Sequence, residues 1–292
     1  MNTITLQDEF AVVTIAPELG ARILCYRHRS HSNQDWVDIV PNAIAEPEQL
    51  TNTAFPLVPF SNRIKDGQFN WQGQAITLMA NLASEPHAIH GHGWQQNWQI
   101  STQSRDSLEL IFSYKAADWP FSYQCKYFFK LVNGNLTQTL TLKNTGSAAM
   151  PFGLGFHPYF IRTDKVNLQA QTTGMWHVDE AVLPSYWQPT SEAFSFNQGA
   201  QISSTQLDNL FTGLSSNIVI NWPEFAKSLT IKCSDNCKFM VVYSPLDAGY
   251  FCVEPVTQTS NAFNADIELG KNEYGVLQAN ETDKIDMHFL IN

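Results

Sequence analysis

The chain of 292 residues has few charged residues and no cluster of basic ones. Charged side chains make up 15% of it, with 17 Lys and Arg against 27 Asp and Glu, which gives a formal charge of −10. Such a chain repels nucleic acids and anionic membranes, so neither is expected as a partner. Its polar surface must depend on Asn, Gln, Ser and Thr, which suits a neutral, hydroxyl-rich ligand.

Cysteines are also few, and they do not form a disulfide pattern. The five are Cys25, Cys125, Cys233, Cys237 and Cys252. An odd, scattered set fits free thiols in a reducing cytoplasm, which is the expected location of the protein. Cys233 and Cys237 have three residues between them and no second pair nearby, so buried or half-exposed strand thiols are favoured over a zinc or redox site.

Long apolar runs and helical periodicity are missing as well. No run of about 18 apolar residues occurs, so no membrane span is expected, and "MNTITLQDEF" does not read as a secretory signal. Only the segment 45–54 could form a helical turn or two. No Gly-rich phosphate loop lies between a strand and a helix, which argues against a nucleotide cofactor.

What the sequence does contain is a long series of short segments in which apolar and polar residues alternate. They are rich in Val, Ile, Thr, Phe and Tyr and are closed by turn residues. The predicted strands lie at 9–17, 21–29, 75–82, 108–116, 123–132, 135–144, 217–222, 228–234, 238–245, 249–256 and 284–292. We therefore predict one all-β domain over residues 1–292, built as an antiparallel sandwich of two large sheets, with a boundary near residue 145 as the alternative.

Four stretches place polar or titratable residues where the pattern asks for apolar ones. In the first, "FPLVPFSNRIKDGQFNWQG", Asn62 and Arg63 follow a loop stiffened by proline. The planar fork of donors on Arg63 could grip two neighbouring hydroxyls or hold a carboxylate in place. The simpler interpretation is a surface arginine that pairs with Asp66.

The second stretch, "HAIHGHGWQQNW", carries His87, His90 and His92 among glycines. Glycines let the backbone approach a ligand, and Trp94 and Trp98 could offer aromatic faces to a sugar ring.

A metal site is the competing interpretation of this stretch. His-x-His in an all-β protein, joined by His157, could form a cupin-like centre. The glutamate that such a site needs a few residues later is missing, because Gln95 and Gln96 occupy the region.

The third stretch, "GLGFHPYF", holds His157 between an aromatic residue and Pro158. The proline favours an extended backbone, and the apolar neighbours should half bury the imidazole ring. Burial lowers the pKa of a histidine and a nearby carboxylate raises it, so a pKa near seven is expected. The alternative is a core histidine that donates to a backbone carbonyl.

The fourth stretch, "LDAGYFCVEPVTQTSNAFN", contains Glu254 on a predicted strand. Alternation places Tyr250, Cys252 and Glu254 on one face of this strand. A carboxylate among such neighbours is costly unless it is paired or protonated, which makes Glu254 a candidate functional group. Its structural alternative is an ion pair with Arg63.

Five short motifs occur in order over residues 62 to 255. They are "NRI" at 62–64, "IHG" at 89–91, "GFHPYF" at 155–160, "LDNLFTG" at 207–213 and "CVEP" at 252–255. Together they are similar to the motifs of the aldose 1-epimerase, or galactose mutarotase, family. The resemblance implies a large, mostly antiparallel β-sandwich with a concave sugar-binding face. The implied activity is the interconversion of the α and β anomers of a hexose, without a cofactor or metal.

The resemblance also implies roles for individual residues. Glu254 would be the general base and His157 the general acid, while Arg63, His90 and Asp208 would contact the sugar. Asp208 matches the family pattern least well, and the role of His92 stays open. The chain would act as a monomer or a homodimer on a small-molecule sugar. Alternatives are a hexose-6-phosphate 1-epimerase, a non-catalytic carbohydrate-binding protein, and a metal enzyme built on the histidines.

Overall fold

The computed structural model describes residues 2–29, 35–43, 52–191, 195–204, 206–215, 217–264 and 273–292. Its regular structure consists of β-strands and short 3-10 turns, and every strand pair within a sheet is antiparallel. The turns are η1 (Pro17–Leu19), η3 (Lys65–Gly67), η4 (Gly93–Gln95), η6 (Pro223–Phe225) and η7 (Ala262–Asn264). The all-β prediction is therefore confirmed.

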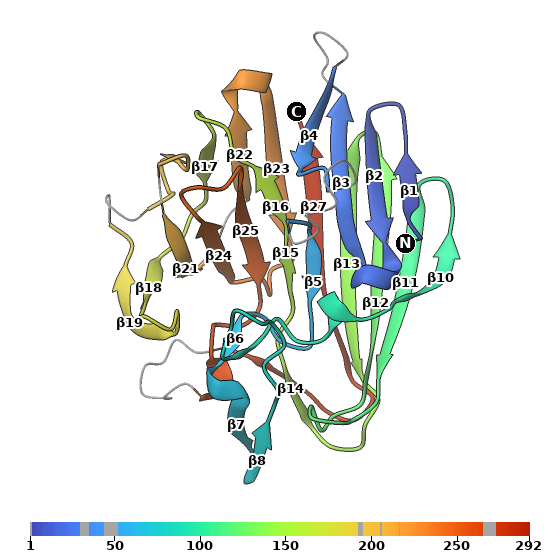
Figure 1. Ribbon diagram of the computed structural model, residues 1–292, viewed down its shortest axis with the longest axis vertical. Helices are drawn as coiled ribbons and strands as arrows, with labels where there is room; N and C mark the ends of the chain where they lie inside the picture. Colours follow the sequence, from blue (N-terminus) through green and yellow to red (C-terminus); the bar gives the residue numbers. More distant parts are fainter. Residues whose placement is uncertain are drawn as a thin grey trace.

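A nine-stranded sheet forms one large layer of the molecule (Figure 1). In spatial order its strands are β10 (Gln99–Gln103), β11 (Ser107–Tyr114), β12 (Tyr123–Val132), β13 (Asn135–Asn144), β27 (Thr282–Ile291), β23 (Lys227–Cys233), β22 (Ile218–Trp222), β17 (Asn167–Gln169) and β20 (Ala200–Gln201). This sheet contains strands from both sides of residue 145, the alternative domain boundary, because β13 pairs with β27 along its length.

An eight-stranded sheet packs against this layer and carries the candidate site. Its order is β19 (Pro184–Pro189), β18 (Gly174–Val178), β21 (Leu207–Thr212), β24 (Phe239–Ser244), β25 (Tyr250–Val256), β15 (Gly155–His157) and β5 (Phe55–Leu57), with β16 (Tyr159–Ile161) also paired to β25.

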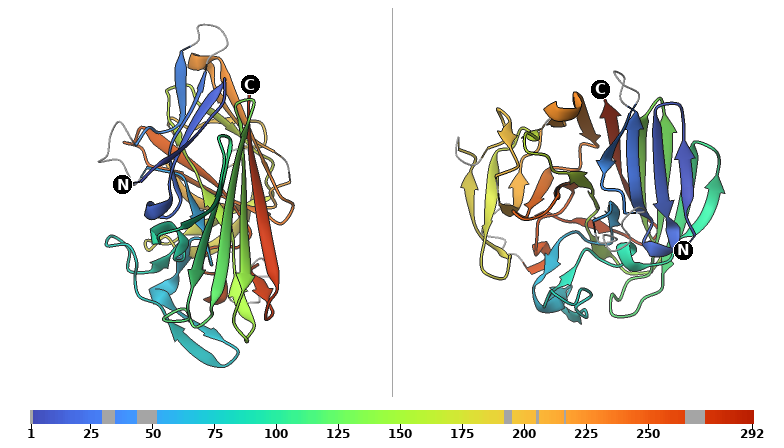
Figure 2. Two further views of the ribbon diagram at one scale, coloured as in Figure 1. Left: turned by 90° about the vertical axis from the view of Figure 1, so that its right-hand side faces the viewer. Right: turned by 45° about the horizontal axis from the view of Figure 1, so that its top comes forward.

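Smaller sheets complete the fold. The four-stranded sheet consists of β1 (Ile4–Gln7), β2 (Ala11–Ala16), β3 (Arg22–Arg29) and β4 (Trp36–Val40), and its strands lie against the β10–β13 end of the nine-stranded sheet (Figures 1 and 2). Three two-stranded ladders join β6 (Arg63–Ile64) to β9 (Ala88–Ile89), β7 (Gln68–Trp71) to β8 (Gln74–Thr77), and β14 (Met150–Phe152) to β26 (Gly275–Leu277).

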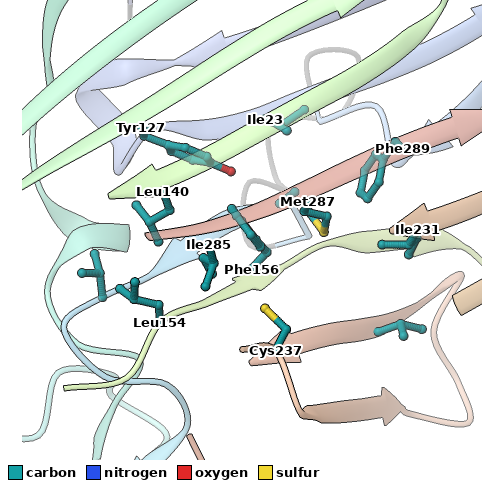
Figure 3. Close-up of a cluster of buried hydrophobic side chains, with 14 of the residues drawn as sticks. Ile23, Tyr127, Leu140, Leu154, Phe156, Ile231, Cys237, Ile285, Met287 and Phe289 are labelled. Atoms are coloured by element: carbon teal, nitrogen blue, oxygen red, sulfur yellow. The ribbon is translucent and has the colours of Figure 1, made fainter. Parts of the chain in front are cut away.

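Alternation along the strands builds the core between the two large sheets. On β12, Tyr127 and Phe129 are buried while Lys126 and Lys130 point outward. Figure 3 shows side chains of the nine-stranded sheet meeting Phe156 of β15 in one apolar cluster. The aromatic and aliphatic residues remove their surface from water here, which is the main force that holds the sheets together.

The pattern-based strands agree closely with the structure where alternation is long. The segments 123–132 and 135–144 are β12 and β13 with the same bounds, whereas β8 stops at Thr77, short of the predicted 82. The sequence did not predict short strands such as β14 and β15. All their residues are buried, so apolar and polar residues do not alternate along them. The possible turn at 45–54 lies mostly outside the described residues. Within the described residues, no helix is long and apolar enough to cross a membrane.

Candidate functional site

The face of the eight-stranded sheet that points away from the main core carries two adjacent rows of side chains. Across β21, β24, β25 and the β15–β16 segment, the first row is Leu210, Val241, Glu254 and His157, and the second is Asp208, Tyr243, Cys252 and Tyr159. Their sequence neighbours Phe156, Phe251 and Val253 point to the opposite face and belong to the main core. The face predicted for Glu254 and Cys252 is therefore confirmed.

Strand register brings His157 and Glu254 together. Gly155 pairs with Val256, and Tyr159 pairs with Cys252, so the same register continues through β15 and β16. His157 and Glu254 are the residues midway between these two pairs, and directly opposite side chains on antiparallel strands have Cβ atoms about 4.5–5.5 Å apart. Pro158, which has no N–H to donate, separates β15 from β16 without breaking the register.

The two side chains form a buried pair. Nε2 of His157 lies 3.2 Å from Oε1 of Glu254, and the two side chains are only 6% and 3% exposed. The imidazole ring packs against Phe55 and Tyr159, with centroid distances of 4.5 and 4.9 Å. Within the described residues, Nδ1 of His157 and Oε2 of Glu254 have no hydrogen-bond partner.

Burial shifts both groups toward their neutral forms. Loss of solvent raises the pKa of Glu254 well above its usual value, with a further rise from Asp208 and an opposing effect of Arg63. Burial also lowers the pKa of His157 to about 3; an interaction with its own backbone opposes this shift, while the positive charges of Arg22 and Arg63 add to it. The expected pKa near seven was wrong for His157, because the ring is completely buried rather than half-buried.

Arg63 is held in place by the residue before it. The backbone of Asn62 adopts the left-handed region at φ 56°, which asparagine tolerates better than most residues. Its Oδ1 accepts hydrogen bonds from the Arg63 N–H at 2.8 Å and from the Ser260 hydroxyl at 2.8 Å. The "NR" pair of the sequence is thus a turn that directs the arginine.

The guanidinium of Arg63 binds carboxylates, but not those expected. Nε and Nη2 donate to the two carboxylate oxygens of Glu85 at 3.0 and 2.8 Å, and Nη2 lies 3.4 Å from Oδ2 of Asp208. Arg63 is buried, so the interpretation as a surface arginine paired with Asp66 was wrong. Its ion-pair partners are also not Glu254, whose partner is His157.

Asp208 lies on β21 with its side chain toward this cluster. Burial raises the pKa of its carboxyl, while Arg63 opposes that rise. The structure thus brings together Arg63 and Asp208, which the sequence associated only through the family resemblance.

His90 reaches the same site from a tight loop. Its backbone has φ 61°, its N–H donates to the Asn62 carbonyl at 3.0 Å, and its ring meets that of His157 edge-on at 5.0 Å. Burial lowers the pKa of His90 well below its usual value, and His157 and Arg63 add to this. His90 is therefore a neutral ring that can donate or accept a hydrogen bond.

The glycines around His92 serve packing rather than ligand approach. Gly91 has φ 68°, and a Cβ there would lie 2.2 Å from the Val58 carbonyl oxygen. A Cβ on Gly93 would lie 2.4 Å from Cγ1 of Val58. The prediction that these glycines admit a ligand was wrong, because the Val58 segment occupies that space.

His92 itself is not part of the site. Its ring stacks on Tyr114 at 4.4 Å, and Nδ1 lies 3.1 Å from the Tyr123 hydroxyl. Trp98 is buried in the main core, and Trp94 packs on Phe55. Neither tryptophan lines the cavity around His157 and Glu254. Within the described residues, the group that could hold a metal ion does not include His90 or His92, so the predicted centre of three histidines is not found there.

The described residues around the buried pair line a cavity of about 230 Å³ that is open on one side to solvent. Sites for drug-sized ligands are typically about 300–1,000 Å³, so this one suits a single small ring. The lining is Asn62, Arg63, Leu82, Ser84, Glu85, Ile89, His90, His157, Tyr159, Asp208, Val241, Tyr243 and Glu254. All five residues predicted to form the site therefore line one cavity.

Among the described residues, one group of side chains could hold a metal ion. Ligand atoms of His157, Cys252 and Glu254 lie within 4.8 Å of one another, which follows from their places in the two rows. A thiol binds metals as the thiolate, and burial raises the pKa of Cys252 well above its usual value. The group is therefore a histidine–glutamate pair beside a thiol that favours its protonated form, and a cation would have to displace that proton.

Sequence reasoning missed Glu85, Tyr159 and Tyr243. Glu85 lies in a loop without periodicity, and its one signal is that it closely precedes the histidine-rich stretch. Tyr159 and Tyr243 look like ordinary strand aromatics, and only the two rows reveal that they frame the cavity.

The sequence matches a family profile described as aldose 1-epimerase over residues 2–289. The chain belongs to the aldose 1-epimerase family. Among curated relatives, YphB of Escherichia coli K12 is 32% identical over 235 residues, covering 76% of this chain and 80% of YphB. YihR of the same strain is 30% identical over 237 residues, covering 77% and 76%. Both relatives are described as uncharacterized proteins.

Solved structures agree with this membership of the aldose 1-epimerase family. A crystal structure from Escherichia coli K12 is 25% identical and has a TM-score of 0.88, covering 100% of this chain and 99% of the other. A galactose mutarotase-like protein from Clostridium acetobutylicum is 20% identical with a TM-score of 0.86, covering 99% and 95%. The predicted galactose mutarotase-like sandwich is therefore confirmed.

Proposed function

We propose that the protein is an aldose 1-epimerase that interconverts the α and β anomers of an uncharged hexose. Glu254 acts as the general base and His157 as the general acid. The observation that carries this proposal is the 3.2 Å contact between these two buried groups at the wall of a cavity of monosaccharide size.

Anomer exchange needs one base and one acid. The base removes the proton of the C1 hydroxyl while the acid protonates the ring oxygen, and the C1–O5 bond breaks to give the open-chain aldehyde. Rotation about the C1–C2 bond then exposes the other aldehyde face, and ring closure uses the same two groups with their roles exchanged. Each positioned proton transfer is typically worth about 10²–10⁴ in rate.

The buried pair can supply both forms that the chemistry requires. The directions of the two pKa shifts place the shared proton on Glu254, next to a neutral His157. Transfer of that proton across the 3.2 Å contact gives a carboxylate and an imidazolium without changing the total charge of the pair. We propose that hydrogen bonds from the sugar stabilise this ionised form, in which Glu254 is a base and His157 an acid.

The remaining groups would orient the sugar. Arg63, His90 and Asp208 offer donors and acceptors to hydroxyls or to the ring oxygen. Tyr159 and Tyr243 would cover the apolar C–H face of the ring, as aromatic side chains with polar ends commonly do.

This chemistry uses only side chains, so we expect no cofactor and no metal. We further expect a monomer or homodimer in the cytoplasm, where the five free cysteines would stay reduced.

Polarimetry on freshly dissolved α-glucose and α-galactose tests the proposal, with the spontaneous rate subtracted. Accelerated decay toward the equilibrium rotation is the expected result. Saturable hexose binding without acceleration would instead identify a non-catalytic carbohydrate-binding protein. Preferred turnover of hexose 6-phosphates would identify the phosphate-specific activity.

A further inference from the structure

We propose that Glu85 restricts the cavity to uncharged sugars, because it neutralises Arg63 and makes the cavity repel phosphorylated and other anionic sugars. This inference rests on the proposed function and assigns its substrate class to a particular residue. Glu85 is a positioning and specificity residue here, since it acts on the sugar through Arg63 and through its own charge.

The hydrogen bonds between Arg63 and Glu85 already use two of the donors on the guanidinium group. Two donors of Arg63, Nε and Nη2, face the two oxygens of Glu85 at 3.0 and 2.8 Å. Bidentate pairs of this kind are the strong, geometrically specific form of charged hydrogen bond. Arg63 is 9% exposed in its side chain and Glu85 17%, so solvent screens their contact little. A sugar phosphate would have to displace Glu85 to gain the same two donors.

The charges around the cavity point the same way. Of the described residues that line it, Arg63 is the one cation, while Glu85, Asp208 and Glu254 are carboxylic acids. Even with Glu254 protonated, two carboxylates remain against one guanidinium. His90 and His157 add no positive charge, because burial holds the pKa of both rings down.

Such a lining discriminates by charge. Like charges placed a few ångströms apart in a partly buried site repel strongly, and mismatched charges are a common means of rejecting wrong ligands. A neutral hexose meets no such repulsion and can use the hydrogen-bonding capacity of the same carboxylates. Glu85 is thus the group whose removal leaves Arg63 free to attract an anion.

The test compares Glu85→Gln with the wild type on glucose and glucose 6-phosphate. The amide keeps the size of the side chain and one acceptor for Arg63 but removes the charge. Glu109→Gln is the matched control, since it removes one carboxylate from β11, outside the cavity lining, where Glu109 pairs with Lys126. Rates are measured by polarimetry after subtraction of the spontaneous rate.

We expect Glu85→Gln to raise the ratio of kcat/KM for glucose 6-phosphate to that for glucose at least tenfold. The ratio should be unchanged in Glu109→Gln. In the wild type, kcat/KM for glucose 6-phosphate should increase as NaCl rises from about 0.02 to 0.3 M, because salt screens repulsion. The dependence of kcat/KM for glucose 6-phosphate on NaCl should weaken in Glu85→Gln. The value of kcat/KM for glucose should not change with NaCl in the wild type or in either variant.

An unchanged ratio in a folded Glu85→Gln variant that still turns over glucose would overturn the inference. A wild type that prefers glucose 6-phosphate would overturn it too. If the wild type accelerates neither sugar, the proposed function fails instead, so the two failures are distinguishable. Should Glu85→Gln not fold, Glu85→Asp, which keeps the charge, must retain the wild-type preference, and a loss of preference there counts against the inference.

Discussion

His157 and Glu254 stand opposite each other on neighbouring antiparallel strands, and Nε2 of the histidine lies 3.2 Å from Oε1 of the glutamate. One continuous register along β15, β16 and β25 sets this pairing, and the same register places Cys252 and Tyr159 beside it. His157 and Glu254 are thus a cross-strand pair, positioned by backbone hydrogen bonds rather than by a flexible loop.

Replacing either member of the pair should nearly abolish catalysis. We expect Glu254→Gln and His157→Ala each to lower the rate of mutarotation by about 10²-fold or more, because each removes one of the two proton transfers. Polarimetry measures the rate, and circular dichroism checks that the fold persists. Near wild-type activity in either folded variant would remove that residue from the mechanism.

Glu254→Gln should also stabilise the protein at neutral and alkaline pH. Below the ordinary pKa of 4.5, the carboxyl is protonated in both folded and unfolded chains and has no effect. As the pH rises above that value, the unfolded chain ionises while the folded chain keeps its proton, so the wild type loses stability until the raised folded pKa is passed. The amide avoids this loss, and we expect a gain of about 0.5–2 kcal/mol at pH 8.

Thermal unfolding of the wild type and Glu254→Gln between pH 4 and 8 provides the measurement. The difference in Tm should be smallest at pH 4 and grow with pH. A difference that shrinks as the pH rises would mean that the folded carboxylate is stabilised rather than destabilised by its surroundings.

The pH dependence of kcat/KM should show a wide plateau. Activity requires one proton on the pair, so it falls when the pair takes up a second proton and when it loses the last one. The acid limb should lie well below 6.5, because burial lowers the pKa of His157 to about 3. The alkaline limb should lie above the usual range of a glutamate, because burial raises the pKa of Glu254. An acid limb near 6.5 would show that His157 titrates like an exposed histidine.

Gly91→Ala should disturb the loop that holds His90. Both Gly91 and Gly73 have positive φ. A Cβ at Gly91 would lie 2.2 Å from the Val58 carbonyl oxygen, whereas a Cβ at Gly73 would meet no atom of the described residues within 4 Å. Gly73→Ala is thus a control for backbone strain alone, worth about 1–2 kcal/mol. We expect Gly91→Ala to cost at least twice as much in chemical denaturation. Equal losses would show that the Val58 segment yields without cost.

Removal of metal ions should leave the activity unchanged. Dialysis against EDTA followed by polarimetry tests this, because the proposed chemistry needs only Glu254 and His157. Loss of activity that Zn²⁺ restores would contradict the prediction and direct attention to the group formed with Cys252. Cys252→Ser would then have to abolish the restoration.

The sequence was most informative where alternation was long. Alternation identified β12 and β13 to the residue and assigned Glu254 and Cys252 to the same face of β25. It was least informative in short, fully buried segments such as β15, where His157 was expected to be half-buried with a pKa near seven. Complete burial depends on residues from other strands, and no local pattern reports it.

The sequence did not predict which side chains pair across the sheet, for the same reason. Nothing in the sequence near Arg63 indicates that its guanidinium group donates to Glu85 and not to Asp66. The glycines beside His92 suggested room for a ligand, but the chain fills that room with the Val58 segment. Such contacts join residues that are distant in the chain.

By itself, then, the sequence determined that the chain forms β-strands and which side chains share a strand face, because a two-residue period is a local property of the backbone. Its five motifs also identified the family. The tertiary structure alone decided that His157 contacts Glu254 and that Glu85 accepts two hydrogen bonds from the guanidinium group of Arg63. Those contacts arise from strand register and from a loop folded over the sheet, which long-range packing fixes and local pattern does not encode.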